Sequence, residues 1–224
     1  MSFRRHTAAS RRLAGVAFAL AALAGCGVGP RPKVGVAVDP AKPLNRQPLA
    51  VPAIDAVLGK IDTVDTQTFT ATYTIKPIAN KTDPVVAKVV QDRTHFSVTI
   101  GDVRFLNAGE PLTCVVSTGR CEPGLHPERV SNVIASGAAF YSTAAAQQIR
   151  VSAARRRSDP IPSMLPFAGI DSTCVAIPIG DGDEVYCAFA GGVLTYIERA
   201  DVTIELTEFG EGADGAALVK PAAA

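Results

Sequence analysis

Apolar residues recur along the chain at two different periods, and these periods predict its first elements. Residues 52–64 place apolar side chains at the spacing of one helix face, at Ile54, Val57, Leu58 and Ile61. Residues 68–75 instead alternate strictly, with aromatic and aliphatic side chains on one side and threonines on the other. This alternation predicts a strand with one face in a core and one face in water.

Further alternating runs extend this pattern along the chain. They predict strands at 85–91, 94–100 with a continuation through Val103 and Phe105, 174–179, 185–190, 193–199 and 202–209. Between the two groups, an alanine-rich stretch at 127–156 predicts a long helix with a potential break at Gly137. Strands, a central helix and strands again, without βαβ alternation, predict an antiparallel α+β fold.

The first 25 residues have the features of an export signal. Four arginines precede an apolar run at 13–24, whose 12 residues suit the core of a signal peptide. A bilayer-spanning helix would need about 20. The run ends in Leu23-Ala24-Gly25-Cys26, which resembles a bacterial lipobox. The resemblance implies that Cys26 receives a diacylglyceryl group and begins the mature chain; an ordinary secretory signal with an incidental cysteine is the alternative. We therefore expect a lipid-anchored protein on the extracytoplasmic face of the cell membrane.

The rest of the chain is expected to form a tether, one domain and a tail. Residues 26–49 hold the lipidated N-terminus and a proline-rich spacer. Residues 50–209 are long enough for one domain with its own core, and the glycine- and alanine-rich residues 210–224 predict a flexible tail. Without the four N-terminal arginines the formal net charge changes from +1 to −3. This charge, with no basic cluster among aromatics, argues against a nucleic-acid partner.

Four cysteines follow Cys26, and two local disulfides are their favoured pairing. Cys174 and Cys187 lie symmetrically about a candidate hairpin turn at Gly180, so that hairpin would place them opposite each other. Cys114 and Cys121 are symmetric about a second candidate turn. A four-thiolate metal site is the alternative, although neither pair has C-x-x-C spacing and exported thiols are seldom kept reduced.

The search for catalytic chemistry finds little. His95 and His126 are the only histidines after the signal, and we expect them to be a hydrogen-bonded strand residue and a helix-start residue. No nucleophile elbow, metalloprotease motif or phosphate-binding loop occurs. The run Arg155-Arg156-Arg157 could meet an anionic lipid headgroup, or could simply mark the C-terminal end of a helix, where cations suit the dipole. We therefore expect no enzyme, no cofactor and no metal.

Two features indicate space beside the sheet. The apolar face of the predicted central helix is diluted by small residues, whereas a helix that only fills a core usually carries more leucine. The segment from Pro160 to Phe167 combines prolines with large apolar side chains and lacks strand alternation. We expect it to be a loop that either packs down or borders the mouth of an apolar pocket. Simple core filling is the alternative for both features.

Taken together, the order of these parts resembles the actinobacterial lipoproteins of the LppX/LprG type, relatives of the LolA/LolB lipoprotein carriers. The lipobox, the tether, the threonine-rich first strand, the central helix and the closing strand at 202–209 carry this resemblance. It implies a strongly curved antiparallel half-barrel whose concave face, closed by helices, encloses an apolar cavity for acyl chains. The cavity-facing residues it implies are Phe69, Tyr73, Phe96, Val98, Phe105, Ile134, Phe140 and Tyr141, with Met164, Leu165 and Phe167 near the mouth. The two cysteine pairs depart from the family's pattern.

The expected function is therefore non-catalytic binding or transfer of an acylated lipid or glycolipid by a membrane-anchored envelope protein. Each methylene sheltered from water would contribute about 0.8 kcal/mol. The competing expectation is an anchored adaptor or sensor whose sheet binds a protein and encloses no lipid.

Overall fold

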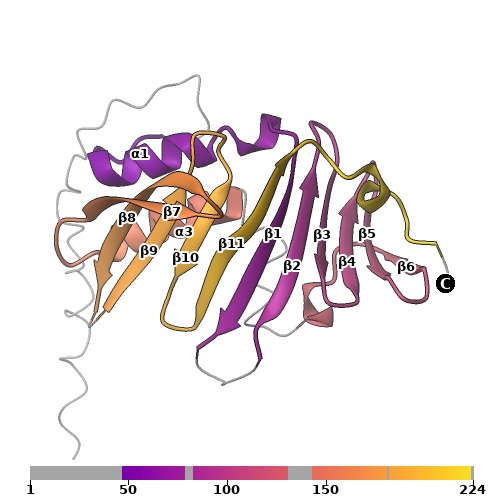
Figure 1. Cartoon of the computed structure of the whole chain (residues 1–224). Helices are drawn as coiled ribbons and strands as arrows, with labels where there is room; N and C mark the ends of the chain where they lie inside the picture. Colours follow the sequence, from indigo (N-terminus) through magenta and orange to yellow (C-terminus); the bar gives the residue numbers. More distant parts are fainter. Residues whose placement is uncertain (1–46, 79–82, 131–142, 181, 223–224) are drawn as a thin grey trace, which may run out of the picture. The chain divides into compact units, whose positions relative to one another are not determined.

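In the computed structural model the described residues are 47–78, 83–130, 143–180 and 182–222, all within the unit from Val36 to Ala224. They form one antiparallel sheet of eleven strands with two α-helices (Figure 1). The strands are β1 (Phe69–Pro77), β2 (Val85–Gln91), β3 (Phe96–Ile100), β4 (Val103–Asn107), β5 (Pro111–Val115), β6 (Arg120–Pro123), β7 (Ile161–Phe167), β8 (Ile170–Ile179), β9 (Gly182–Ala188), β10 (Leu194–Glu198) and β11 (Val202–Glu211).

Two meanders make up the sheet and meet at its centre. Strands β1 to β6 follow one another outward on one side, and β7 to β11 return inward on the other, so that β1 pairs with the last strand, β11. The edge strands β6 and β7 each pair with one neighbour, and the sheet is therefore open. This confirms the antiparallel α+β class predicted from the order of the elements.

The helices α1 (Pro52–Ile61) and α3 (Thr143–Arg155) pack against each other and cover one face of the sheet near β8 and β9. Helix α1 buries the four residues that its spacing predicted. Pro52 begins the helix, and the Asp55 carboxylate accepts hydrogen bonds from the backbone N–H groups of Leu49 (2.8 Å) and Val51 (3.1 Å). The apolar side chains of both helices and the sheet form one continuous core.

The sheet bends strongly at its β7 end. Strand β7 is three strands away from β10, a separation of about 14 Å in a flat sheet, because neighbouring strands lie about 4.8 Å apart. Nevertheless, the ring of Phe167 on β7 stacks on the ring of Tyr196 on β10, with centroids 4.9 Å apart. Tyr196 pairs with Cys187, and paired residues point to the same face of a sheet. Tyr186, the neighbour of Cys187, faces α3, so Cys187 and Tyr196 point away from the helices. The end of β7 that stacks on Tyr196 therefore folds over the face opposite the helices.

The segment expected to be a loop at 160–167 is this edge strand, so that prediction is wrong. β7 pairs with β8 along its whole length and joins it through a two-residue turn at Ala168 (φ 49°) and Gly169 (φ 75°). The closing pair of such a turn, Phe167 and Ile170, is hydrogen-bonded. Counting back from this pair, every second residue points its backbone N–H and C=O groups away from β8, and these residues include Pro162 and Pro166. Proline is tolerated at such outward positions of an edge strand, and its presence hid the strand pattern.

The predicted helix at 127–156 is also shorter than expected. Pro127–Arg129 forms only a 3₁₀ turn, after which Val130 is extended, and α3 begins at Thr143. Gly137 lies outside the described residues. The neighbouring strands β5 and β6, which periodicity alone missed, form the hairpin that the cysteine spacing predicted.

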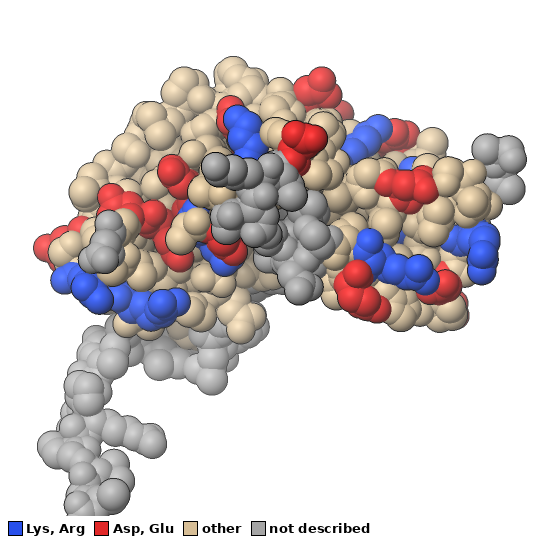
Figure 2. Space-filling view, turned by 90° about the horizontal axis from the view of Figure 1, so that it is seen from below, with Lys and Arg blue, Asp and Glu red and all other residues tan. Residues whose placement is uncertain are grey.

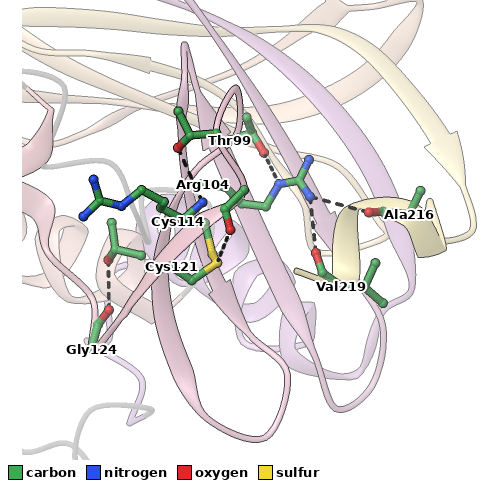
Figure 3. Close-up of a disulfide and its surroundings, with 11 residues drawn as sticks. Thr99, Arg104, Cys114, Cys121, Gly124, Ala216 and Val219 are labelled. Atoms are coloured by element: carbon green, nitrogen blue, oxygen red, sulfur yellow. Dashed lines mark hydrogen bonds between the residues drawn. A yellow bond between two sulfur atoms is a disulfide. The ribbon is translucent and has the colours of Figure 1, made fainter. Parts of the chain in front are cut away.

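The C-terminal segment packs on the sheet face opposite the helices instead of extending freely from residue 210. Strand β11 continues to Glu211, and Gly215–Leu218 forms a 3₁₀ turn, η4. Asp214 pairs with Lys88 of β2 at 2.7 Å, and the guanidinium of Arg104 reaches the carbonyls of Ala216 and Val219 (3.5 and 3.4 Å; Figure 3). Small residues fit closely against the sheet here, although their composition suggested a flexible tail.

Replacing Leu218 with alanine tests this packing. Leu218 is 8% exposed and, with Ala217, packs on Val90. Losing that buried leucine surface should lower the free energy of unfolding by about 2 kcal/mol. Urea denaturation measures the effect, and Val219→Ala, at a side chain that is 58% exposed, is the control and should change stability by less than about 0.5 kcal/mol. Equal effects of the two substitutions would contradict the packing.

Candidate binding site

Most of the side chains expected to line a cavity are packed in the core on the helix-bearing face. Phe69, Tyr73, Val98 and Phe105 are at most 1% exposed and belong to the continuous core, and Phe96 packs partly buried against it. The Tyr73 hydroxyl donates a hydrogen bond to the carbonyl of Leu194 (2.9 Å), which ties β1 to β10 across the core. Tyr73, Val98 and Phe105 therefore belong to the packed core, whereas Phe69 also borders one of the pockets described below. Ile134, Phe140, Tyr141 and Cys26 lie outside the described residues.

The three residues expected at the cavity mouth lie on the edge strand instead. Met164 and Leu165 are 62% and 43% exposed, and Phe167 is half-buried under Tyr196. None of the three lines any of the pockets described below. The structure thus separates them from Phe69 and its neighbours in the core.

One pocket with a largely apolar lining lies between α3 and the sheet and has a volume of about 170 Å³. On one side it is bounded by Ala144 and Ala145, whose small side chains leave the space open. The sheet contributes aliphatic side chains, and the polar groups of Gln148, Tyr186 and Arg199 also border it. The sheet residues with aliphatic side chains are Ile197, Val202 and Ile204. This arrangement offers an apolar ligand one aliphatic wall and a few polar contacts.

A polar cluster that includes Tyr186, one of the lining residues, lies beside this pocket. The Tyr186 hydroxyl donates to the carboxylate of Glu184 (2.8 Å) and lies 3.2 Å from the hydroxyl of Ser152 on α3, which also contacts Glu184. Burial is the main cause that raises the pKa of the Tyr186 phenol well above its usual range, so the side chain stays neutral and keeps its donor. The cluster fixes α3 against β9 and holds the helix side of the pocket in place.

Two further pockets differ in character. One, of about 220 Å³, is bordered by Phe69, Phe189 and Phe209 and by glycine and polar residues; the Phe209 ring contacts the rings of the other two phenylalanines. The other, of about 350 Å³, lies at the β4–β6 end and is lined by Arg120, Glu122 and Arg129 among others. Charged residues of both signs are also interspersed over the face seen in Figure 2. The larger pocket therefore presents several charged groups to a ligand.

Neither histidine belongs to a catalytic arrangement among the described residues. His95 follows β2 in a turn, where the carboxylate of Asp92 accepts from the backbone N–H groups of Thr94 (2.7 Å) and His95 (2.6 Å) and contacts the His95 ring (3.0 Å). The bond to the ring is the largest of the contacts that lower the pKa of Asp92. This is the geometry of a turn-stabilising aspartate. In the described part of the chain, no three His, Cys, Asp or Glu side chains are grouped as metal ligands.

His126 is expected to titrate above the ordinary histidine pKa. Its Nε2 lies 2.9 Å from the carbonyl of Pro123 and its Nδ1 3.0 Å from the carboxylate of Glu128. Both acceptors favour the doubly protonated ring, and the Pro123 carbonyl is the larger cause that raises the pKa. The stabilisation of the fold by the protonated His126 ring is fully present below the pKa of His126 in the unfolded chain. It is lost as pH rises through the pKa of His126 in the folded chain.

NMR titration of the ring protons measures this shift. Glu128→Gln removes the charge of one acceptor and should lower the pKa of His126 towards its usual value. A titration that is identical in the variant and the natural chain would show that the contact with Glu128 does not persist in solution.

The four cysteines form the two local disulfides that their spacing favoured. Cys114 bonds to Cys121 across β5 and β6, and Cys174 bonds to Cys187 across β8 and β9. Figure 3 shows the first of these bridges. Both cysteines of the second bridge are fully buried. Two disulfides in a small domain are typical of a protein outside the cytoplasm.

Comparisons with known proteins find similarity only at the level of structure. No family model matches the sequence, and no curated protein does. Among solved structures, the Pseudomonas aeruginosa MucA/MucB complex has a TM-score of 0.41 at 12% identity, covering 72% of this chain and 58% of that chain. MucB alone has a TM-score of 0.42 at 10% identity, covering 73% and 60%. This chain thus spans about three fifths of the MucB chains.

A LolA superfamily protein from Nitrosomonas europaea has a TM-score of 0.34 at 12% identity. The similarity covers 72% of this chain and 94% of that chain. TM-scores below 0.5 do not establish a shared function, and the site must be judged from its own residues.

Proposed function

We propose that this protein is a lipid-anchored lipoprotein of the cell envelope, of the kind that the LppX/LprG-type sequences represent, and that it binds an acylated lipid without catalysing a reaction. Cys26 carries the anchor, and residues 27–46 connect it to the folded domain. The acyl chain enters between α3 and the sheet. The bound molecule is an acylated lipid or glycolipid.

The observation that carries the proposal is the apolar pocket beside Ala144 and Ala145. A helix that only filled a core would bring large side chains to this position, whereas alanine leaves about 170 Å³ open against Ile197, Val202 and Ile204. Each methylene that leaves water for such a surface contributes about 0.8 kcal/mol. Gln148 and Arg199 at the same pocket provide donors for the polar end of a ligand.

The anchor and the disulfides are consistent with this role. Disulfides form and persist in oxidising compartments, such as the space outside the cytoplasm. In the described residues no helix is long and apolar enough to span a bilayer. Two or three acyl chains on Cys26 would hold the protein on the membrane surface.

Filling the pocket tests the proposal. Ala144 is exposed and borders the pocket, so Ala144→Leu places a larger side chain in the opening without overpacking the core. We expect the variant to bind a fluorescent polyene fatty acid at least tenfold more weakly than the natural chain, because losing two buried methylenes costs about 1.6 kcal/mol and about 1.4 kcal/mol is a factor of ten. Fluorescence titration measures the dissociation constant.

Ala154→Leu is the matched control, because Ala154 is an exposed alanine of the same helix that does not border the pocket. It should bind the probe as the natural chain does. If neither variant changes binding, or if the natural chain binds no acyl probe, the pocket is not the acyl site, and an anchored adaptor or sensor becomes the better interpretation.

A further inference from the structure

Several exposed apolar side chains of this domain lie on the edge strand β7 and on the helix that precedes it. Eight large apolar side chains are exposed in the described part of the chain, and four of them lie between residues 151 and 165. On the edge strand, Ile161, Met164 and Leu165 are 58%, 62% and 43% exposed, and Val151 on the preceding helix is 45% exposed. Such a concentration indicates a contact surface.

The backbone of this edge is poorly suited to accept another strand. Phe167 and Ile170 close a two-residue turn and form a hydrogen-bonded pair, so Pro162, Met164 and Pro166 present their backbone outward. Two of these three residues lack an N–H, and only Met164 can donate to an added strand. Proline at these positions is a recognised protection of edges against strand pairing. A partner must therefore contact the side chains of this edge.

The segment that leads from the end of α3 into β7 is strongly basic. Arg155, Arg156 and Arg157 at the end of α3 are all exposed, and Arg155 follows Val151 by one helical turn. Between residues 150 and 167 there are four arginines and a single acid, Asp159. The exposed Asp171 and Asp183 lie on the adjoining strands. Arginine beside exposed aliphatic side chains is the composition that binds anionic bilayer surfaces.

The described chain also begins beside this helix. The carbonyl of Gln47 accepts a hydrogen bond from the guanidinium of Arg150 on α3, so the tether enters the domain beside this helix. The 20 residues between Cys26 and Gln47 can reach about 70 Å, which is ample for the domain to touch the surface that holds its anchor.

The two absent N–H groups also suit the edge to an interface with little water. An unpaired backbone N–H in a bilayer interface is costly, and Pro162 and Pro166 remove two such groups from the outward side of β7. The exposed side chains of Ile161, Met164 and Leu165 can then enter the headgroup region.

We propose that these residues form a basic apolar edge that docks the domain on an anionic phospholipid surface. The edge consists of Val151, Arg155, Arg156, Arg157, Ile161, Met164 and Leu165. Docking brings α3 and the pocket beside it to the membrane from which a lipid would enter. The argument from the tether rests on the proposed anchor, whereas the charge, the exposure and the prolines do not.

Vesicle binding by an unanchored chain tests the proposal. The chain from Gly27 to Ala224 retains all eleven strands and both described helices, and its core lies entirely within residues 47–222. We expect it to sediment with phosphatidylcholine vesicles that contain phosphatidylglycerol, and to be released by high salt. A double substitution, Arg155→Ser with Arg156→Ser, should weaken this binding about tenfold or more, and Met164→Ser with Leu165→Ser should do the same.

The matched control substitutes an exposed apolar and an exposed basic residue away from this edge, Val86→Ser with Arg93→Ser. It should bind as the natural chain does, and unchanged melting temperatures confirm that all variants are folded. Equal binding to vesicles with and without phosphatidylglycerol, unchanged binding by the edge variants, or self-association through Met164 and Leu165 would each overturn the proposal. Because this chain lacks Cys26 and the assay contains no free acyl ligand, those results would leave the acyl pocket and the anchor untouched.

Discussion

Replacing Tyr73 with alanine is expected to lower the free energy of unfolding by about 3–5 kcal/mol, the largest effect of any single substitution considered. Tyr73 is fully buried at the centre of the sheet, where β1 pairs with β11 and the register shifts by one residue. Its ring fills the core beneath the helices, and its hydroxyl satisfies the carbonyl of Leu194. Alanine would leave both a cavity and an unpaired buried carbonyl. Urea denaturation measures the loss.

A second variant separates the ring from the hydroxyl. Tyr73→Phe keeps the ring and removes only the donor to Leu194, and should cost about 1–3 kcal/mol. Tyr196→Phe is its control, because the Tyr196 hydroxyl contacts Glu198 in an exposed setting, and its loss should cost less than about 0.5 kcal/mol. Equal costs at the two tyrosines would mean that the buried bond to Leu194 contributes nothing.

Removing the Cys174–Cys187 disulfide is expected to cost about 3 kcal/mol. The bond closes a loop with a sequence separation of 13, and the chain-entropy estimate for a loop of this length is about 3 kcal/mol. Both cysteines are fully buried, so alanine at both positions also loses some packing. Thermal and urea denaturation of Cys174→Ala with Cys187→Ala measure the effect.

The Cys114–Cys121 pair offers the comparison. Its sequence separation of 7 predicts a slightly smaller cost of about 2.5 kcal/mol for the corresponding double alanine variant. Reductant should lower the stability of the natural chain by roughly the two costs together. A natural chain whose stability is insensitive to reductant would show that the disulfides are absent in solution.

Periodicity predicted the elements wherever one face is buried and the other is in water. The apolar positions of α1 and the alternation in β1 identified those elements because burial is the physical cause of both patterns. Strand β2 was predicted with its observed bounds for the same reason. The cysteine spacing added what periodicity missed, because two residues can be bridged only if a hairpin places them side by side.

The failures have equally specific causes. Strand β7 has almost no buried side chain, so its sequence carries no alternation, and its prolines suggested a loop although they suit an outward-facing edge. The tail after residue 209 is rich in small residues, and composition alone did not show that Ala217 and Leu218 would pack on Val90. Both segments lie on the outside of the sheet, where hydrophobic patterning is weakest.

The candidate site was predicted less well than the fold. Inward residues such as Val98 and Phe105 were expected to line a cavity but are packed core, because a pattern of alternation shows only that a side chain points inward and not what it meets there. The small residues of α3 were the more informative signal, since an apolar pocket lies beside Ala144 and Ala145.

The mass of the protein from its own host tests the central claim most directly. The chain is purified from the host membrane, and its native mass is compared with the mass of the same sample after denaturation, which retains only covalent lipid. We predict a native mass that exceeds the denatured mass by that of one acylated lipid. Identical masses across preparations would contradict lipid binding by this domain.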